Sequence, residues 1–257
     1  MRVSAFLLPL FSILAGIGGF LFRRSEHINV FDVITGLPVR DAPVFGLAIY
    51  SLIFVIIVVV FAVRASIKHK ALDGFESAFG TDPLLYPVIF VLIGMLWIAG
   101  TYLHFANIAG NREISVDDIL FITFSALSAI SVTFFAIEMY QDSRRNAPYA
   151  LSVVPTLFLC FWLILVFRDN STNPTLISYS YQSLAIVASA LGFYFTAGFL
   201  YGKPAPGRAI FAYNSAIFFS IITLADDHSF GITLLIYAII SANVVYSVML
   251  IRNLQRK

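Results

Sequence analysis

Hydrophobic residues along this chain gather into eight long runs separated by short polar segments. A bilayer with a hydrocarbon core about 30 Å thick is crossed by about 20 helical residues, with a working range of about 17–25. We expect each run to form a membrane-spanning α-helix, and the runs cover residues 3–22, 44–63, 84–105, 118–139, 149–167, 176–201, 209–224 and 231–251. The seventh run is the shortest. The pattern predicts an all-α transmembrane bundle that forms one domain over residues 1–257.

Residues that cap or break helices lie between the runs. Asp82–Pro83 precedes the third run and Asn173–Pro174 precedes the sixth. Ser115 and Asp118 have the spacing of a capping box at the start of the fourth run. Residues 202–207, with the sequence Gly-Lys-Pro-Ala-Pro-Gly, separate the sixth run from the seventh. These signals predict where the helices end.

Two connecting segments have patterns of their own. Residues 28–39 place β-prone halves on either side of Thr35–Gly36, which predicts a short β-hairpin over the outer mouth of the bundle. In the segment 64–82, Leu72, Phe75 and Phe79 recur at helical spacing. We therefore expect a short helix that lies in the membrane interface.

Composition excludes an ordinary soluble domain. Hydrophobic residues make up 60% of the chain and charged residues 12%, whereas soluble domains carry about 25% charged residues. A soluble fold of this size could not bury so much apolar surface. The first run is long for a signal peptide, so we expect it to be retained as a span. The single cysteine, Cys160, excludes an intramolecular disulfide and a Cys-based metal site.

Basic residues predict the orientation, because Lys and Arg accumulate in short cytoplasmic loops. With eight spans, 11 of the 16 Lys and Arg residues fall on the side of both termini and 5 on the other side. Both termini are therefore expected in the cytoplasm, in a multi-pass protein of the cell membrane. Nine of the 14 acidic residues fall on the outer side. The basic inner side suits anionic lipid head groups, and we expect no nucleic-acid partner.

Two asparagines, Asn214 and Asn243, lie at equal sequence distance from the turn between the seventh and eighth runs. On antiparallel helices they would sit at matching depth, roughly 20 Å below that turn. We expect them to form a structural polar pair through an interhelical amide hydrogen bond. Gly198 and Gly202 at the end of the sixth run are typical of close helix packing, within the chain or between copies in a homo-oligomer.

Polar side chains also gather towards the outer ends of the runs, and polar residues in spans are costly unless they have a role. The candidate ligand-binding residues are His104, Asn107, Tyr181, Gln182 and Asp226. Histidines and carboxylates can bind a divalent metal, but no diagnostic metal-ligand spacing accompanies them. We predict no catalytic residue, no resident metal and no cofactor. No charged residue lies at the centre of a run, which disfavours an ion-coupled carrier with a buried carboxylate.

Residues 19–24 (Gly-Phe-Leu-Phe-Arg-Arg) and 31–38 (Phe-Asp-Val-Ile-Thr-Gly-Leu-Pro) resemble the start of uncharacterised multi-span membrane proteins of anaerobic Gram-positive bacteria. The resemblance covers about the first 45 residues. It implies a bacterial plasma membrane and no particular activity.

Three functions remain open at this point. The first is binding or moving a small molecule, lipid or ion through an outer-facing vestibule, and the acidic outer side favours it. The second is a non-catalytic accessory or scaffold protein that packs against partner membrane proteins. The third is a metal-dependent intramembrane enzyme, for which we find no nucleophile–base pair and no metal cluster in the sequence.

Overall fold

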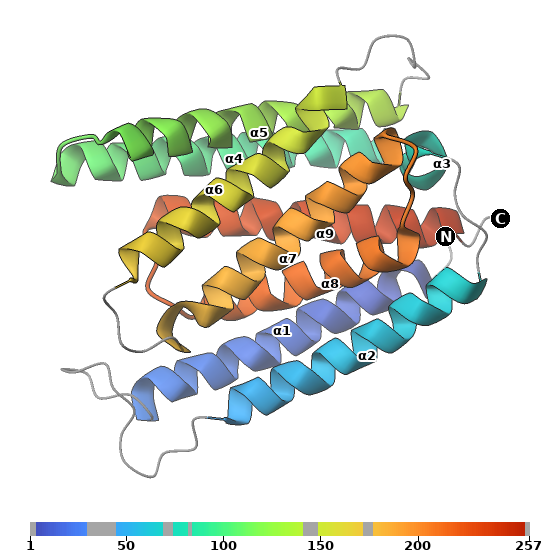
Figure 1. Ribbon diagram of the computed structural model, residues 1–257, viewed down its shortest axis with the longest axis horizontal. Helices are drawn as coiled ribbons and strands as arrows, with labels where there is room; N and C mark the ends of the chain where they lie inside the picture. The colour runs from blue at the N-terminus through green and yellow to red at the C-terminus, as the bar shows by residue number, and fades with distance from the viewer. Residues whose placement is uncertain are drawn as a thin grey trace.

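The computed structural model describes residues 4–29, 45–68, 74–81, 84–140, 149–171 and 177–254, and within these ranges the regular structure is helical throughout. Long helices run side by side along the molecule (Figure 1). The helices are α1 (Ser4–Asn29), α2 (Gly46–Lys68), α3 (Phe75–Phe79), α4 (Leu85–Asn111), α5 (Val116–Tyr140), the 3-10 helix η1 (Tyr149–Val153), α6 (Val154–Asp169), α7 (Ile177–Leu200), α8 (Pro206–Thr223) and α9 (Phe230–Leu254). Each of the eight predicted runs coincides with one of the long helices.

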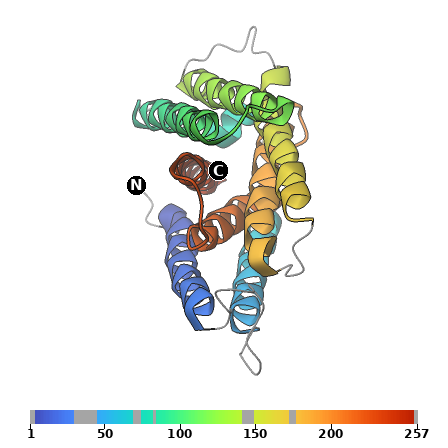
Figure 2. The ribbon, with the colours of Figure 1, turned by 90° about the vertical axis from the view of Figure 1, so that its left-hand side faces the viewer.

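Seven of the described helices are long and apolar enough to cross a bilayer, and α8 is not among them. Helix α8 packs against α7, α1, α9 and α2, and nearly all of its residues are buried. It lies in the middle of the bundle (Figure 2). A helix surrounded by other helices needs no apolar face towards lipid, so it can carry Asn214 and several hydroxyl side chains. Its central position explains why α8 is not among the seven helices that are apolar enough to face lipid.

Helix α1 has the reverse of the pattern of a soluble amphipathic helix. Its buried face consists of small or polar residues at intervals of three and four: Ala5, Pro9, Ser12, Gly16, Gly19, Arg23 and Glu26. Its large apolar residues, such as Leu7, Leu14 and Leu21, are 58–60% exposed. A side chain at Gly19 would lie 2.6 Å from Ile222 Cγ1 of α8. Small residues inside and large ones outside are typical of a helix packed in lipid.

Aromatic side chains fill the space enclosed by α4, α5, α6, α7 and α9. Trp97 is fully buried and lies 5.9 Å from the Phe158 ring and 6.0 Å from the Phe193 ring, measured between centroids. Towards the Lys203 end of the bundle, Tyr246 stacks on Tyr213 at 5.8 Å. These rings interlock through much of the bundle's length, so the core is packed with side chains.

The two predicted connecting elements have different outcomes. Most of the predicted hairpin lies outside the described residues, but its first two residues belong to α1, which runs on to Asn29. The residues from Arg23 to Asn29 are therefore helical and do not form the start of a loop. The predicted short helix exists as α3, but Phe79 is fully buried against Phe199 and Tyr246. Helix α3 thus inserts an aromatic side chain into the bundle, and its position in the membrane interface stays a prediction.

Candidate functional site

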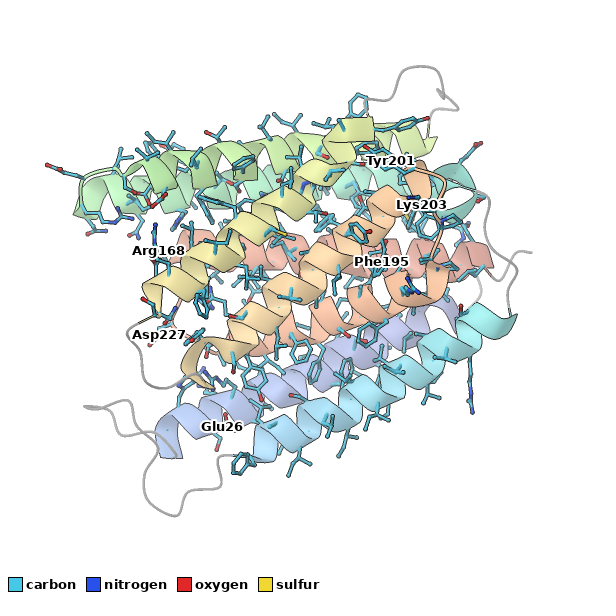
Figure 3. All side chains as sticks on the ribbon, in the orientation of Figure 1. Glu26, Arg168, Phe195, Tyr201, Lys203 and Asp227 are labelled. Atoms are coloured by element: carbon cyan, nitrogen blue, oxygen red, sulfur yellow. The ribbon has the colours of Figure 1, made fainter. Side chains whose placement is uncertain are left out.

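Ionisable side chains converge at the end of the bundle that carries Asp227. Figure 3 shows Glu26, Arg168 and Asp227 at this end, and Tyr201 and Lys203 at the opposite end. Figure 2 looks onto the Asp227 end, where the connection between α8 and α9 lies next to α1. We call the residues that meet there the Arg23 cluster: Arg23, Glu26, His27, Tyr181, Thr223, Asp226 and His228.

Arg23 is the centre of this cluster, and its side chain is completely buried. Its position four residues after Gly19 places it on the small, buried face of α1. Its Nε donates a hydrogen bond to Asp226 Oδ1 at 2.9 Å. Its guanidinium carbon lies 5.3 Å from the centroid of the Tyr181 ring, in a cation–π contact. One arginine thus holds α1 to α7 and to the α8–α9 connection.

Asp226 receives hydrogen bonds from three residues. Besides Arg23, its Oδ1 lies 2.9 Å from His27 Nε2, and its Oδ2 accepts a hydrogen bond from Thr223 Oγ1 at 3.1 Å. Burial works to raise the pKa of Asp226, but the hydrogen bond from His27 and the charge of Arg23 outweigh it. The pKa therefore lies below its ordinary value, and the carboxylate is ionised at neutral pH.

Glu26 brings a second carboxylate to the cluster and connects it to α2. Its Oε2 lies 3.5 Å from Arg23 Nη1, and its side chain is 8% exposed. It also accepts a hydrogen bond from the backbone amide of Leu47, in the first turn of α2. A carboxylate is favourable at that position, because the first amides of a helix point towards it. Residues of α1, α7, the end of α8 and the α8–α9 connection therefore meet at the cluster, next to the first turn of α2.

His228 completes the cluster from the α8–α9 connection. Its Nε2 lies 3.2 Å from Thr223 Oγ1. Burial lowers the pKa of His228, and the neighbouring charge of Asp226 only partly opposes this effect. A hydroxyl next to an imidazole has the geometry of a nucleophile and its base. Thr223 is 1% exposed, however, and an acyl substrate has no room beside it.

A small cavity lies directly below the cluster, between α6, α7, α8 and α9. It is lined by Trp162, Gln182, Ala185, Ile186, Ser189, Ser220, Thr223, Ile236 and Ile239. The cavity has a volume of about 10 Å³, which is room for about one water molecule. Thr223 belongs to both the cavity wall and the Arg23 cluster, so the cavity and the cluster meet at this residue.

The five predicted ligand-binding residues divide into two groups. Tyr181 and Asp226 belong to the Arg23 cluster, and Gln182 lines the cavity below it. His104 lies elsewhere, with its ring edge-on to Phe121 at 5.1 Å and its Nδ1 3.5 Å from Ser229 Oγ. Asn107 is exposed and accepts a hydrogen bond from Asn111. Three of the five are therefore brought together, and His104 and Asn107 are not part of that group.

The expected hydrogen bond between Asn214 and Asn243 is not formed. Asn214 donates to Ser247 Oγ at 3.0 Å and to the Ile210 carbonyl, and it accepts from Ser12 Oγ at 2.9 Å. Asn243 donates to the carbonyl of Ile239, one turn earlier in its own helix. Asn214 finds hydroxyl partners on α1 and α9 because α8 is the central helix. It joins three helices, whereas an amide pair would have joined two.

Further ion pairs at this end of the bundle have structural roles. Ser115 and Asp118 form the predicted capping box, with Asp118 accepting a hydrogen bond from the Ser115 amide at 2.8 Å. Arg112 forms a bidentate pair with the same carboxylate at 2.7 Å, and this pair raises the pKa of Arg112.

Within the described ranges, no group of three His, Cys, Asp or Glu side chains is arranged to hold a metal ion.

Sequence reasoning missed Arg23, Glu26 and His27, because it placed them in a loop after the first span. A signal for them exists in the sequence. Arg23 and Glu26 continue the three-and-four spacing of Ser12, Gly16 and Gly19, which marks the buried face of α1.

Comparisons with known proteins give no relative from which a role for these residues could be transferred. No protein-family model, no curated protein and no solved structure matches this chain.

Proposed function

We propose that this chain is an integral membrane protein with eight spans and both termini in the cytoplasm. The eight long helices alternate in direction along the bundle (Figure 1), which supports this topology. Helix α8 is counted as a span together with the seven more apolar helices. At 1.5 Å per residue, the 18 residues of α8 extend roughly 27 Å, close to the thickness of a hydrocarbon core. The excess of Lys and Arg at the end that carries Lys203 makes that end the cytoplasmic one. The Arg23 cluster then lies on the outer side.

Its proposed activity is to bind a small polar molecule or ion at the outer end of the bundle. The observation that carries this proposal is the cavity beside the cluster, whose wall includes Gln182 and Thr223, and Thr223 also donates a hydrogen bond to Asp226. Buried charges are expensive in a membrane protein and are typical of functional sites. The cluster holds one arginine and two carboxylates, and this excess of carboxylates favours a cation or a hydrogen-bond donor.

Binding is favoured over transport across the membrane. Below the cavity, the space between the helices is occupied by interlocked aromatic rings such as Trp97, Phe193 and Tyr246. Asn214 engages Ser12 and Ser247 at mid-bundle depth. This packing supports a site that opens to one side.

Single-cysteine labelling in a Cys160→Ala background tests the proposal. An impermeant thiol reagent is added to the outside of intact cells that carry cysteine at position 104, 182, 214 or 243. We expect Gln182→Cys to react more slowly than the exposed control Asp227→Cys, and positions 214 and 243 to stay unlabelled. Unreactive Gln182→Cys beside a reactive control would contradict an outer site. Labelling at 214 and 243 would contradict the one-sided site and indicate an aqueous path.

A second candidate function is a scaffold that packs against partner membrane proteins. The densely packed aromatic core favours it, because such a core makes a rigid body without needing a ligand. If the thiol reagent does not label Gln182→Cys, this alternative is favoured. Crosslinking to neighbouring membrane proteins would then test it.

A further inference from the structure

We propose that the end of the bundle that carries Lys203 holds an anionic phospholipid of the adjacent leaflet. In this site Lys203 and Arg208 bind the head group, and the exposed face of α7 lies beside an acyl chain. The site is at the opposite end of the bundle from the Arg23 cluster (Figure 3). It therefore goes beyond the proposed function and does not depend on the outer cavity.

The first argument is the pairing of charges at the two ends of the bundle. At the outer end, Arg23, Arg112 and Arg168 each form an ion pair with a carboxylate. At the opposite end, Glu76 is the one acidic side chain that the structure describes. The described basic side chains at that end form no ion pair with a described residue, and they are Arg64, Lys203, Arg208 and Arg252. Anionic head groups would supply the missing countercharge.

The second argument is the rigidity of the α7–α8 connection, which carries the two proposed ligands. Gly202 has a φ of +67°, and the Lys203 amide donates a hydrogen bond to the Gly198 carbonyl at 2.8 Å, as in a Schellman motif. Gly207 then packs so closely on α2 that a side chain there would lie 2.8 Å from a backbone oxygen of that helix. Lys203 and Arg208 are both exposed. The backbone therefore holds two cations at the surface in fixed positions.

The third argument is a pair of tyrosines beside the connection. Tyr149 and Tyr201 are 47% and 51% exposed, and their ring centroids lie 6.0 Å apart. Exposed tyrosines in a membrane protein are enriched at the level of the lipid head groups. Tyr201 precedes Lys203 by two residues, and both lie at this end of the bundle (Figure 3). The Lys203 ammonium is thus placed at head-group depth, where a phosphate is the complementary group.

The exposed face of α7 gives the lipid a place for its acyl chain. Val187, Tyr194 and Tyr201 are exposed and lie seven residues apart, so they share one face of the helix. At 1.5 Å per residue, Tyr194 lies roughly 10 Å and Val187 roughly 21 Å from Tyr201 along the helix axis. A lipid whose head group contacts Lys203 would run its acyl chain past Tyr194. Val187 lies further along the same face, towards the other leaflet.

Quenching by chain-brominated lipid measures which lipid occupies this face. A bimane fluorophore is attached at Tyr194→Cys in the full chain with Cys160→Ala, in phosphatidylcholine nanodiscs. Brominated phosphatidylglycerol or brominated phosphatidylcholine then replaces part of the lipid. We expect phosphatidylglycerol to be preferred at this position. Lys203→Gln and Arg208→Gln should each lower the preference by up to about fivefold, the contribution of one basic residue near an anionic surface.

Two matched controls separate the site from a general effect of charge. Arg24→Gln removes an exposed arginine at the opposite end of the bundle, and it should leave the preference at Tyr194→Cys unchanged. A fluorophore at Val187→Cys lies on the same face of α7 but further from Lys203, and there the two lipids should quench equally.

The proposal is overturned if phosphatidylglycerol is not preferred at Tyr194→Cys, or if the preference survives replacement of both Lys203 and Arg208. Salt tests it without any substitution in the site: the preference should fall as potassium chloride is raised, because exposed charges are screened, and a constant preference would contradict the site. Displacement of the lipid by soluble glycerol phosphate would assign the site to a free phosphate compound and overturn the lipid assignment. None of these results depends on labelling at Gln182→Cys, which tests the outer site.

Discussion

Replacement of Arg23 by methionine should destabilise the bundle strongly, because it leaves a buried carboxylate without its cation. Methionine keeps the apolar stem of the side chain and removes the charge. Breaking a buried ion pair by removing one partner costs about 3–5 kcal/mol. Asp226 retains its contacts with His27 and Thr223. We therefore expect the free energy of unfolding to fall by an amount near the lower limit, about 3 kcal/mol. For a chain of this size, that loss lowers the melting temperature by roughly 6–12 °C.

The measurement is unfolding in detergent micelles, followed by circular dichroism during heating and during titration with sodium dodecyl sulfate. The matched control is Arg24→Met, which removes the same charge from the exposed neighbouring position. A double variant, Arg23→Met with Asp226→Asn, should lose less stability than the sum of its two single variants, because the unpaired carboxylate is gone. The reasoning is refuted if the free energies of unfolding of Arg23→Met and Arg24→Met differ by less than about 0.5 kcal/mol, the usual range for a surface substitution.

Three further predictions concern packing, polar contacts and pH. Gly19→Val should lower the free energy of unfolding by about 1–3 kcal/mol through overpacking against α8, whereas Gly110→Val, with open space around it, should have little effect. Asn214→Leu should cost about 1–2 kcal/mol by removing interhelical hydrogen bonds, and equal stability would refute that role. Acid should destabilise the fold as the pH falls below about 6.5, because buried His228 binds its proton less tightly in the folded than in the unfolded chain. Asp226, whose folded pKa is lowered, should add a further loss below about pH 4, and flat stability from pH 7 to pH 3 in the same micelles would contradict both assignments.

The helices were predictable because a bilayer demands long apolar runs, and this signal is local in the sequence. The Ser115–Asp118 capping box was predictable for the same reason, since its two residues lie three positions apart. Tyr181, Gln182 and Asp226 were found as polar residues near the ends of apolar runs. Whether these three residues lie close together depends on how α7 packs beside α8. The sequence shows only that each of them is costly to bury.

The parts that sequence reasoning did not reach depend on the identity of the central helix. If α8 is known to be central, Asn214 must find partners on α1 and α9, and the expected pair with Asn243 is no longer needed. Likewise, Arg23 looked like a loop residue because the end of α1 was set by hydropathy. Its burial becomes intelligible only when the face that it shares with Gly19 is packed against α8.

The central claim is that α8 is a buried span that brings the number of spans to eight, and the residues at its two ends test this claim most directly. Lys203 precedes α8 and Asp227 follows it; both are exposed, and they lie at opposite ends of the bundle (Figure 3). In a Cys160→Ala background, Asp227→Cys should react with an impermeant thiol reagent on intact cells, and Lys203→Cys should react only after the membrane is permeabilised. Labelling of both positions from the same side would mean that α8 does not cross the membrane, and would contradict the eight-span bundle and its outer site.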